Sequence, residues 1–369
     1  MGEFNINKEK VLAALSTVEE PDLKKDLVTL NMIKDIEVGV NQITFTVILT
    51  TPACPLKELI KQRCLDAIHR DLSPDIEVTI NMTSDVTTNL NKSVALPGVK
   101  NIIAVSSGKG GVGKSTLTVN LAMALKQSGA KVGIIDADIS GPSIPIMFGA
   151  QDMQPLVTVK DGKNYINPIL QYGIKMISIG FLTPPDSAVV WRGPMASQAL
   201  KQFFNDVDWG ELDYLLLDMP PGTGDIHLTL VQSVPVTGAI IITTPQKVAL
   251  ADATKGGSMF VQPNINVPIL GVIENMSYFT PEELPENKYY IFGQGGGEQI
   301  AKKFNVPVLG NIPIVQKIRE GGDEGRPIMM DENAIISKAF KSAAENLAQQ
   351  IAIRNANMPK TETVKVGVN

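Results

Sequence analysis

The sequence predicts an α/β protein with a doubly wound, mostly parallel sheet, preceded by a small α+β domain. After residue 100, short runs that are apolar on both faces alternate with stretches of helical spacing. This is the pattern of parallel strands covered by helices on both sides. Before residue 84, the apolar residues follow the spacing of amphipathic helices and of partly alternating strands, which indicates a separate unit of mixed composition.

Seven apolar runs mark the expected strands of the large domain, which we place at residues 100–354. They read "NIIAVSS", "KVGIIDAD", "IKMISIGFL", "YLLLDMP", "GAIIITT", "ILGVIENM" and "VPVLGNIP". Because helical stretches separate them, the strands are expected to be joined by right-handed crossovers.

The first 83 residues form the expected small domain. An amphipathic helix comes first, and Gly39 and Asn41 then interrupt two apolar segments, as in a β-hairpin. A second helix in "PLKELIKQRCLDAIHRDL" and a third strand in "DIEVTINMTS" complete it. Residues 84–99 contain polar residues and a Pro-Gly pair and are predicted to be a linker. The polar residues 355–369 are predicted to be a disordered tail.

Composition narrows the class of protein. The chain has 369 residues, a net charge of −5 and two cysteines, Cys54 and Cys64. The charge argues against broad attraction to nucleic acid or to an anionic membrane, and no apolar run is long enough for a membrane span. The cysteine count excludes a disulfide framework and suits a reducing cytoplasm. We therefore expect a cytoplasmic protein that binds neither nucleic acid nor membranes.

A phosphate-binding loop lies between the first apolar run and a predicted helix. "GKGGVGKS", Gly108 to Ser115, fits the G-x-x-x-x-G-K-[ST] pattern in its required strand-to-helix context. Its glycines let backbone N–H groups face phosphate oxygens, and the helix N-terminus favours the negative charge. Lys114 is expected to bind the β- and γ-phosphates, and the Ser115 hydroxyl to coordinate Mg²⁺.

Aspartates end two of the other apolar runs. Asp218 closes "YLLLD", where it can organise Mg²⁺ through its water shell. Asp136 and Asp138 close "VGIIDAD", and either can polarise an attacking water. Phosphoryl transfer to water requires groups of this kind at the same edge of the sheet as the phosphate loop.

The loop "GKGGVGKST" resembles the deviant phosphate loop of the MinD/ParA-type ATPases. In that superfamily the early lysine reaches across a homodimer to the partner's nucleotide, and Lys109 holds its position here. A cation supplied in this way neutralises charge on the γ-phosphate, which couples hydrolysis to dimerisation.

Longer motifs resemble one branch of that superfamily, the Mrp family of iron–sulfur cluster carrier ATPases, over about residues 98–350. They are "DADISGPSIPIMFG", "WRGPMASQALKQFF", "DYLLLDMPPGTGDIHLTL", "TTPQKVALAD" and "GVIENMSYF". The first domain, with "TTPACPLKELI", resembles the SufT/PaaD-like domain often fused ahead of such ATPases.

The resemblance implies a set of site residues and partners. ATP would be held by Gly108, Lys109, Gly110, Gly111, Val112, Gly113, Lys114, Ser115 and Thr116. Asp138 would position the hydrolytic water, while Asp218 and the loop from Pro220 to Asp225 would sense the γ-phosphate. Asn275 would hydrogen-bond the base, since an amide both donates and accepts, and the "NIPI" segment from Asn311 would pass near the nucleoside. The protein would be a homodimer that transiently carries an iron–sulfur cluster and delivers it to apoprotein clients.

One departure from the family pattern concerns the cluster. Family members typically have a Cys-x-x-Cys pair shortly after "ENMS", whereas this loop reads "ENMSYFTPEELPENKYYIFGQGGG". Its Glu282, Glu283 and Glu286 are hard oxygen donors, poor substitutes for thiolates around a cluster, and we do not assign them as ligands.

The two cysteines lie in the small domain instead. If Pro55 occupies the first position of a helix, Cys54 is its N-cap, where the helix dipole favours the thiolate. Cys54 is therefore a candidate cluster-related thiol. Cys64 lies about 15 Å further along the same helix, too far to share a cluster, and is expected to be a core residue.

Three alternatives remain open at this point. The protein can be an ATP-gated scaffold that has lost cluster binding. It can be a MinD/ParA-like positioning ATPase, which would need a basic surface or a membrane-binding helix. A reductase like the nitrogenase iron protein would need cysteines beyond the phosphate loop, and both cysteines precede it.

Overall fold

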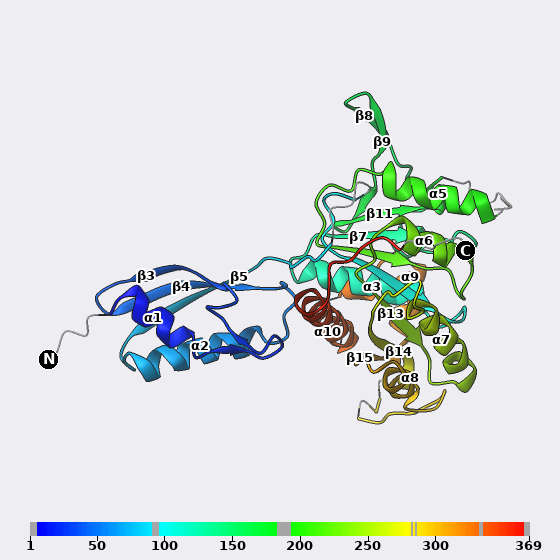
Figure 1. Cartoon of the computed structure of the whole chain (residues 1–369). Coiled ribbons are helices and arrows are strands. Elements are labelled where there is room, and N and C mark those ends of the chain that lie inside the picture. The colour runs from blue at the N-terminus through cyan, green and yellow to red at the C-terminus, as the bar shows by residue number, and fades with distance from the viewer. Residues whose placement is uncertain are drawn as a thin grey trace.

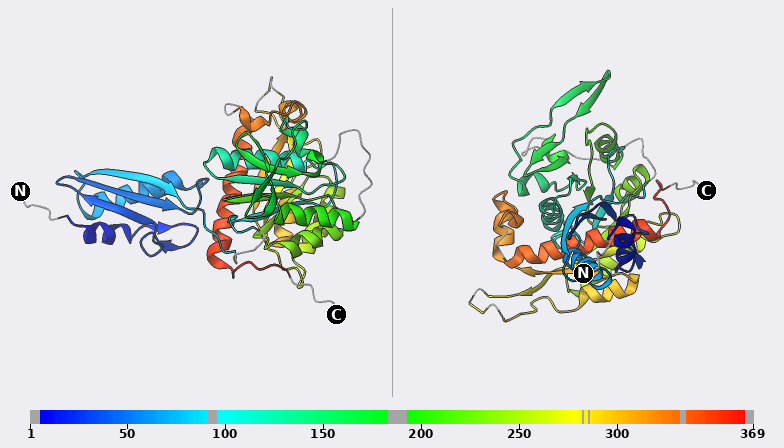
Figure 2. Two further views of the ribbon diagram at one scale, coloured as in Figure 1. Left: turned by 90° about the horizontal axis from the view of Figure 1, so that it is seen from above. Right: turned by 90° about the vertical axis from the view of Figure 1, so that its left-hand side faces the viewer.

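The structure is a computed structural model that describes residues 6–90, 96–182, 193–281, 283–284, 286–331 and 335–364. It has a small N-terminal domain and a larger α/β domain, which lie next to each other in Figure 1. The left view of Figure 2 shows helix α10 (Ile335–Asn357, orange-red) at the junction between them.

The N-terminal domain is built on a three-stranded sheet in the order β3-β4-β5. Strands β3 (Ile33–Val38) and β4 (Gln42–Leu49) are antiparallel, which confirms the expected hairpin, and β5 (Glu77–Ser84) runs parallel to β4. Helix α2 (Lys57–Asp71) is the crossover that a parallel pair requires. Helix α1 (Lys8–Leu15) and the short pair β1 (Glu19–Glu20) and β2 (Lys25–Asp26) complete the domain.

The larger domain has an eight-stranded sheet in the order β10-β11-β7-β12-β6-β13-β14-β15. All seven expected runs are strands in it: β6 (Ile102–Ser107), β7 (Val132–Asp136), β11 (Ile174–Ser178), β12 (Tyr214–Asp218), β13 (Gly238–Thr243), β14 (Ile269–Phe279) and β15 (Val308–Ile314). They are mutually parallel. The doubly wound prediction is confirmed.

Helices cover both faces of this sheet and enclose two apolar cores. On one face, α3 (Lys114–Gln127) and α10 (Ile335–Asn357) pack in the same core as Tyr214 and Leu216 of β12. The other face carries α5 (Gly193–Asn205), α6 (Asp225–Ser233), α7 (Lys247–Phe260) and α8 (Gly296–Phe304). The short elements α4 (Ile144–Met147), η1 (Ile179–Phe181), α9 (Gln316–Asp323) and η2 (Ile328–Met330) lie between strands and helices.

Two features of the sheet edge do not follow from the sequence pattern. Strand β10 (Ile169–Gln171) joins β11 antiparallel at the edge of the sheet. A hairpin of β8 (Val157–Lys160) and β9 (Lys163–Ile166) precedes it and projects away from the sheet in Figure 1. These strands of three or four residues are too short to show a clear alternating pattern.

The expected tail is ordered over most of its length, so that prediction is corrected. Helix α10 continues to Asn357, and Thr361 pairs with Leu90 of the linker in an isolated bridge. The side chain of Asn89 donates to the carbonyls of Asn355 and Met358. Polar side chains therefore fix this segment through specific hydrogen bonds, which a composition argument does not detect. Residues 365–369 lie outside the described part of the chain.

Within the described residues, no helix has the length and apolar character needed to cross a membrane.

Candidate functional site

The candidate site lies where the carboxyl ends of the central strands meet. Strand β6 lies between β12 and β13, and the chain leaves β6 toward β7 on the β10 side but passes from β12 to β13 on the β15 side of the sheet. Open α/β sheets bind ligands in the crevice at such a switch point. Two adjoining pockets of about 180 and 440 Å³ open here, and both are lined by Gly113, Thr116, Ser143 and Met147.

The phosphate-binding loop connects β6 to α3, and two of its glycines are required by the packing. Gly113 has a left-handed backbone (φ +81°), and a Cβ there would lie 2.3 Å from Nδ2 of Asn275. A Cβ on Gly108 would lie 1.9 Å from the backbone of Asp252 in α7. Neither approach leaves room for a side chain, so β14 and α7 hold the loop closely from two sides.

Lys114, Ser115 and Asp218 form a buried polar cluster beneath this loop. Lys114 Nζ lies 2.9 Å from Oδ2 of Asp218, and Ser115 Oγ donates to the same oxygen at 2.6 Å. Thr118 Oγ1 donates to the other carboxylate oxygen at 2.7 Å. Asp218 is fully buried and Lys114 is 6% exposed. The cluster joins the start of α3 to the end of β12.

The donor set of this cluster fits Mg²⁺. The Ser115 hydroxyl and the Asp218 carboxylate converge within hydrogen-bond distance of each other, and Mg²⁺ takes such oxygen ligands together with water and phosphate. Within the described residues, no group of three or more His, Cys, Asp or Glu side chains is arranged to hold a metal ion. A magnesium ion here would therefore also need ligands from nucleotide and water, as is usual for this ion.

The two aspartates after β7 occupy different environments. Asp138 is half-buried and lines the smaller pocket, where burial raises the pKa of its carboxyl. Asp136 lies behind it, fully buried, and accepts hydrogen bonds from Ser178 Oγ at 2.9 Å and from the backbone of Ile144 at 3.3 Å. Burial, followed by the nearby Asp218 charge, raises the pKa of Asp136. Asp138 is thus the aspartate with access to a ligand.

Lys109 is exposed and lines the smaller pocket together with Gly110 and Gly111. Its backbone carbonyl accepts a hydrogen bond from Ser107 Oγ at 3.0 Å, which fixes the entry of the loop. Its position at the mouth of the pocket differs from that of Lys114, which lies at the base of the loop.

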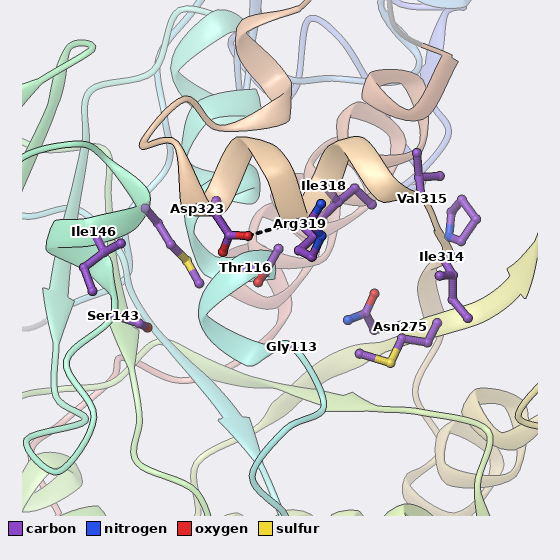
Figure 3. Close-up of a pocket in the computed structure, with 14 residues that line it drawn as sticks. Gly113, Thr116, Ser143, Ile146, Asn275, Ile314, Val315, Ile318, Arg319 and Asp323 are labelled. Carbon is purple, nitrogen blue, oxygen red and sulfur yellow. Dashed lines mark hydrogen bonds and ion pairs between the residues drawn. The ribbon is translucent and has the colours of Figure 1, made fainter.

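The larger pocket extends from the loop toward α9. Asn275 of β14 reaches it from one side and donates from Nδ2 to the Val112 carbonyl at 2.9 Å. Pro313, Ile314 and Val315, at the end of β15, also line it. Figure 3 shows Ile314 and Val315 on the same side as Asn275, across the pocket from Ser143 and Ile146. The "NIPI" segment therefore borders this pocket. Arg319 and Asp323, on one face of α9, pair at 2.7 Å at its rim.

His227 organises the loop from Pro220 to Asp225. Its Nδ1 accepts a hydrogen bond from the Gly224 N–H at 3.2 Å, at the start of α6. The side chain is almost fully buried, and burial lowers its pKa to about 4. A weaker interaction with the Pro220 backbone raises the pKa of His227. Among the described residues, however, no group has the geometry of a hydrogen bond to Nε2. His227 is therefore a neutral structural residue at pH 7.

Sequence reasoning missed Thr118 and Ser178, which orient the two buried aspartates. Thr118 lies four residues after Lys114 in α3, and this helical spacing was the available signal. Ser178 ends β11 beside Asp136 of β7, a pairing that the sequence does not reveal.

The prediction for Cys54 is wrong in its local structure. Helix α2 begins at Lys57 with Leu56 as its N-cap, so the Cys54 thiol does not cap the helix. Burial, followed by weaker effects of Glu20, Asp22 and Glu345, raises the pKa of Cys54 to about 11. The thiol is therefore protonated at neutral pH. Cys64 is fully buried in the small domain, as expected for a core residue, and both cysteines are free.

The end of β14 and the loop after it carry aromatic residues, in the segment where the family resemblance predicted a Cys-x-x-Cys pair. Phe279 pairs with Tyr289 in an antiparallel bridge, and Tyr278 meets Tyr290 edge-on. Glu283 and Glu286 are exposed in this loop, and Glu282 lies outside the described residues.

Two protein-family models match the chain. The model described as NUBPL iron-transfer P-loop NTPase matches residues 98–351, which is more than half of the chain. The model described as iron-sulfur cluster assembly protein matches residues 8–80. The two matches cover the two domains of the structure.

Full-length relatives and one solved structure agree with these matches. The chain is 47% identical over 350 residues to the iron-sulfur cluster carrier protein of Synechocystis, covering 94% of this chain and 99% of that one. It is 45% identical over 355 residues to the protein of the same name from Haemophilus influenzae, covering 95% and 94%. A nucleotide-binding protein from Archaeoglobus fulgidus, solved with ADP, is 36% identical with a TM-score of 0.55 and covers 67% of this chain and 96% of that one.

Proposed function

Because the chain belongs to the NUBPL iron-transfer P-loop NTPase family, we propose that it binds and hydrolyses ATP with Mg²⁺ to carry iron–sulfur clusters to apoproteins. The observation that best supports the ATP part is the buried cluster of Lys114, Ser115 and Asp218 under the phosphate-binding loop. A buried lysine and carboxylate at the switch point of the sheet suit a ligand that carries both phosphate and a divalent cation.

Each residue of the site has a role in this proposal. The backbone N–H groups of the loop and Lys114 hold the phosphates, and Asn275 contacts the base. Ser115 and Asp218 hold Mg²⁺, which when bound neutralises phosphate charge. Asp138 orients the attacking water by accepting a hydrogen bond from it, and the loop from Pro220 to Asp225 responds to the γ-phosphate. Catalysis is then mostly positioning and charge stabilisation.

A homodimer completes the site in this proposal. Lys109 is exposed at the mouth of the smaller pocket, where it can reach a nucleotide bound by a facing subunit. Large apolar side chains are exposed on elements that follow the carboxyl ends of the strands: Ile146, Val248, Tyr289, Tyr290 and Ile291. Exposed apolar side chains gathered at one edge favour association through that edge.

The cluster is cargo in this scheme, and thiolates are the ligands that it would need. The names of the relatives support a carrier, while the chain has only Cys54 and Cys64. Cys64 is buried, so Cys54 thiols from two chains, or Cys54 with client thiols, would hold the cluster. The two free thiols suit a reducing compartment, and we place the protein in the cytoplasm.

The scarcity of cysteines favours a second candidate function, an ATP-gated scaffold that docks assembly clients without holding a cluster. Reconstitution with iron and sulfide under anaerobic conditions separates the two. Iron retention and visible absorption that disappear in Cys54→Ser support the carrier. No bound iron in a protein with intact ATP turnover supports the scaffold.

ATP turnover by Lys114→Ala tests the nucleotide site itself. Loss of the Nζ that contacts phosphate should reduce turnover by at least about 100-fold. Lys126→Ala, an exposed position in the last turn of the same helix, is the matched control and should behave as wild type. Normal turnover in Lys114→Ala would refute the site assignment.

A further inference from the structure

His227 is the third residue of α6, and its side chain turns back onto the loop that leads into this helix. Its Nδ1 accepts a hydrogen bond at 3.2 Å from the N–H of Gly224, which is the N-cap of the helix. A side chain that accepts from the N-cap in this way is half of a capping box, where Glu or Gln is the usual residue. Unlike either of these, an imidazole ring holds a second nitrogen at a fixed distance from the first.

The second nitrogen of His227, Nε2, is a buried donor. Because Nδ1 accepts, the proton of the neutral ring is on Nε2. The side chain is 1% exposed, and within the part of the chain that the structure describes no group has hydrogen-bond geometry to Nε2. The Pro220 backbone is nevertheless close: burial has the largest effect on the pKa of His227 and lowers it, and Pro220 comes next and raises it. A buried donor left unpaired costs free energy, so a small shift of the Pro220 carbonyl toward the ring is favourable.

The loop that starts at Pro220 borders the phosphate pocket. Pro221 lines the smaller pocket together with Lys114. The Gly222 N–H donates to the Ser107 carbonyl at 3.1 Å, at the entry of the phosphate-binding loop. A shift of this loop therefore moves one wall of the pocket that receives the phosphates in the proposed function.

We propose that His227 is a positioning residue for the γ-phosphate and that it clamps both ends of this loop through its two ring nitrogens. Nδ1 holds Gly224 with either nucleotide, whereas Nε2 donates to the Pro220 carbonyl only when the loop has moved to meet a γ-phosphate. The inference rests on the proposed function and deepens it, because it assigns the distinction between ATP and ADP to His227. A hydrogen bond that forms only in the ATP-bound state shifts the population toward that state.

The first test is the ratio of the affinities for a non-hydrolysable ATP analogue and for ADP, each with Mg²⁺, measured by isothermal titration of the full chain. His227→Asn keeps an acceptor near the position of Nδ1 but places no donor at Nε2. The ratio should fall by at least about fivefold, the equivalent of one hydrogen bond, while the affinity for ADP stays as in wild type. An unchanged ratio in folded His227→Asn, or an equal loss of affinity for both nucleotides, overturns the proposal.

His227→Gln is the conservative variant. Its amide has both an acceptor and a donor, and Gln is a usual residue at the third position of a capped helix. It should keep most of the wild-type ratio, and a loss as large as that in His227→Asn overturns the assignment to Nε2. Gln232→Asn, which shortens an exposed side chain later in α6, is the matched control and should leave both affinities unchanged.

NMR of the wild-type protein decides the matter should His227→Asn fail to fold. The chain has two histidines, so isotope-labelled histidine gives signals from His69 and His227 alone. The Nε2 proton of His227 should exchange with water at least about fivefold more slowly when the ATP analogue replaces ADP. His69, which contacts the Ile76 carbonyl in the small domain at 3.1 Å, is the internal control and should not change.

The failure of this inference is distinguishable from the failure of the proposed function. A wild-type protein that binds neither nucleotide overturns the proposed function and this inference with it. A wild-type protein that binds both nucleotides, but whose His227 proton exchanges equally fast in the two complexes, overturns the inference alone.

Discussion

Lys114 Nζ lies 2.9 Å from Oδ2 of Asp218, so the lysine assigned to phosphate and the carboxylate assigned to Mg²⁺ neutralise each other. The pair is almost completely buried, and removing one partner of such a pair leaves an uncompensated charge. A nucleotide with its cation offers each partner a replacement of opposite charge. Each of the two buried charges therefore has a partner of opposite sign both before and after binding.

Asp218→Asn should weaken the site and the fold together. It leaves the Lys114 charge without a carboxylate, which should lower the free energy of unfolding by roughly 3 kcal/mol. Mg²⁺-dependent ATP turnover should fall by at least about 100-fold, because the amide is a poor magnesium ligand. Urea unfolding and a phosphate-release assay measure the two effects.

The control for this change is Asp208→Asn, since Asp208 pairs with the exposed Lys160 at the surface. Surface pairs contribute at most about 1 kcal/mol, and this variant should hydrolyse ATP normally. Equal losses in the two variants would contradict a special role for Asp218.

Lys109 and Lys114 should complement each other between subunits. Lys109→Ala and Lys114→Ala should each be nearly inactive alone. In a mixed dimer, the loop of the Lys109→Ala chain retains Lys114 and receives Lys109 from its partner, so one complete site forms. Random mixing should then restore about a quarter of wild-type turnover. A mixture as inactive as its components would show that Lys109 does not act across a dimer.

The fold and the grouping of Lys114, Ser115 and Asp218 at one edge of the sheet were predictable because their signals are local. Seven apolar runs became seven strands, since residues buried on both faces of a sheet must be apolar over a continuous stretch. The glycines, Lys114 and Ser115 are contiguous, and Asp218 ends an apolar run.

The errors arose where the outcome depends on contacts between distant segments. The raised pKa of Cys54 comes from burial against the core of the small domain, with weaker effects of charges that include Glu345 of α10, and nothing in "TPACPL" reveals either. The tail is ordered because Asn89, some 266 residues earlier than Asn355, donates to its carbonyl. The antiparallel β10 is likewise defined by its pairing with β11.

Asn275→Ala should reduce nucleotide affinity in a way that tests its proposed contact with the base. One N–H of the amide already holds the Val112 carbonyl, and an amide has a further donor and an acceptor. Loss of the side chain should weaken ATP binding about tenfold, equivalent to about 1.4 kcal/mol, and should reduce the preference for ATP over GTP. Isothermal titration with both nucleotides measures this. Equal weakening for ATP and GTP would show that Asn275 only supports the loop and does not contact the base.

His227 should make the fold less stable in mild acid. Burial lowers the pKa of His227 to about 4, below the value of about 6.5 in an unfolded chain. Between these values the unfolded state binds more protons, so the stabilisation present above pH 6.5 is lost as the pH falls toward 4. The raised pKa of Asp136 has the opposite effect on stability. Its carboxyl binds a proton at a higher pH in the folded state than in the unfolded state, so it stabilises the fold as the pH falls.

A substitution at His227 separates its contribution to the pH dependence of stability from that of Asp136. His227→Asn keeps an acceptor near the position of Nδ1, for the Gly224 N–H, but cannot be protonated in this range. The free energy of unfolding of wild type should fall by about 2 kcal/mol more than that of His227→Asn between pH 7.5 and pH 5. Urea unfolding at the two pH values measures the difference, and Asp136 cancels because both proteins contain it. An equal loss of unfolding free energy in the two proteins would mean that His227 is protonated equally in the folded and unfolded states. That result would contradict a buried, neutral His227 ring.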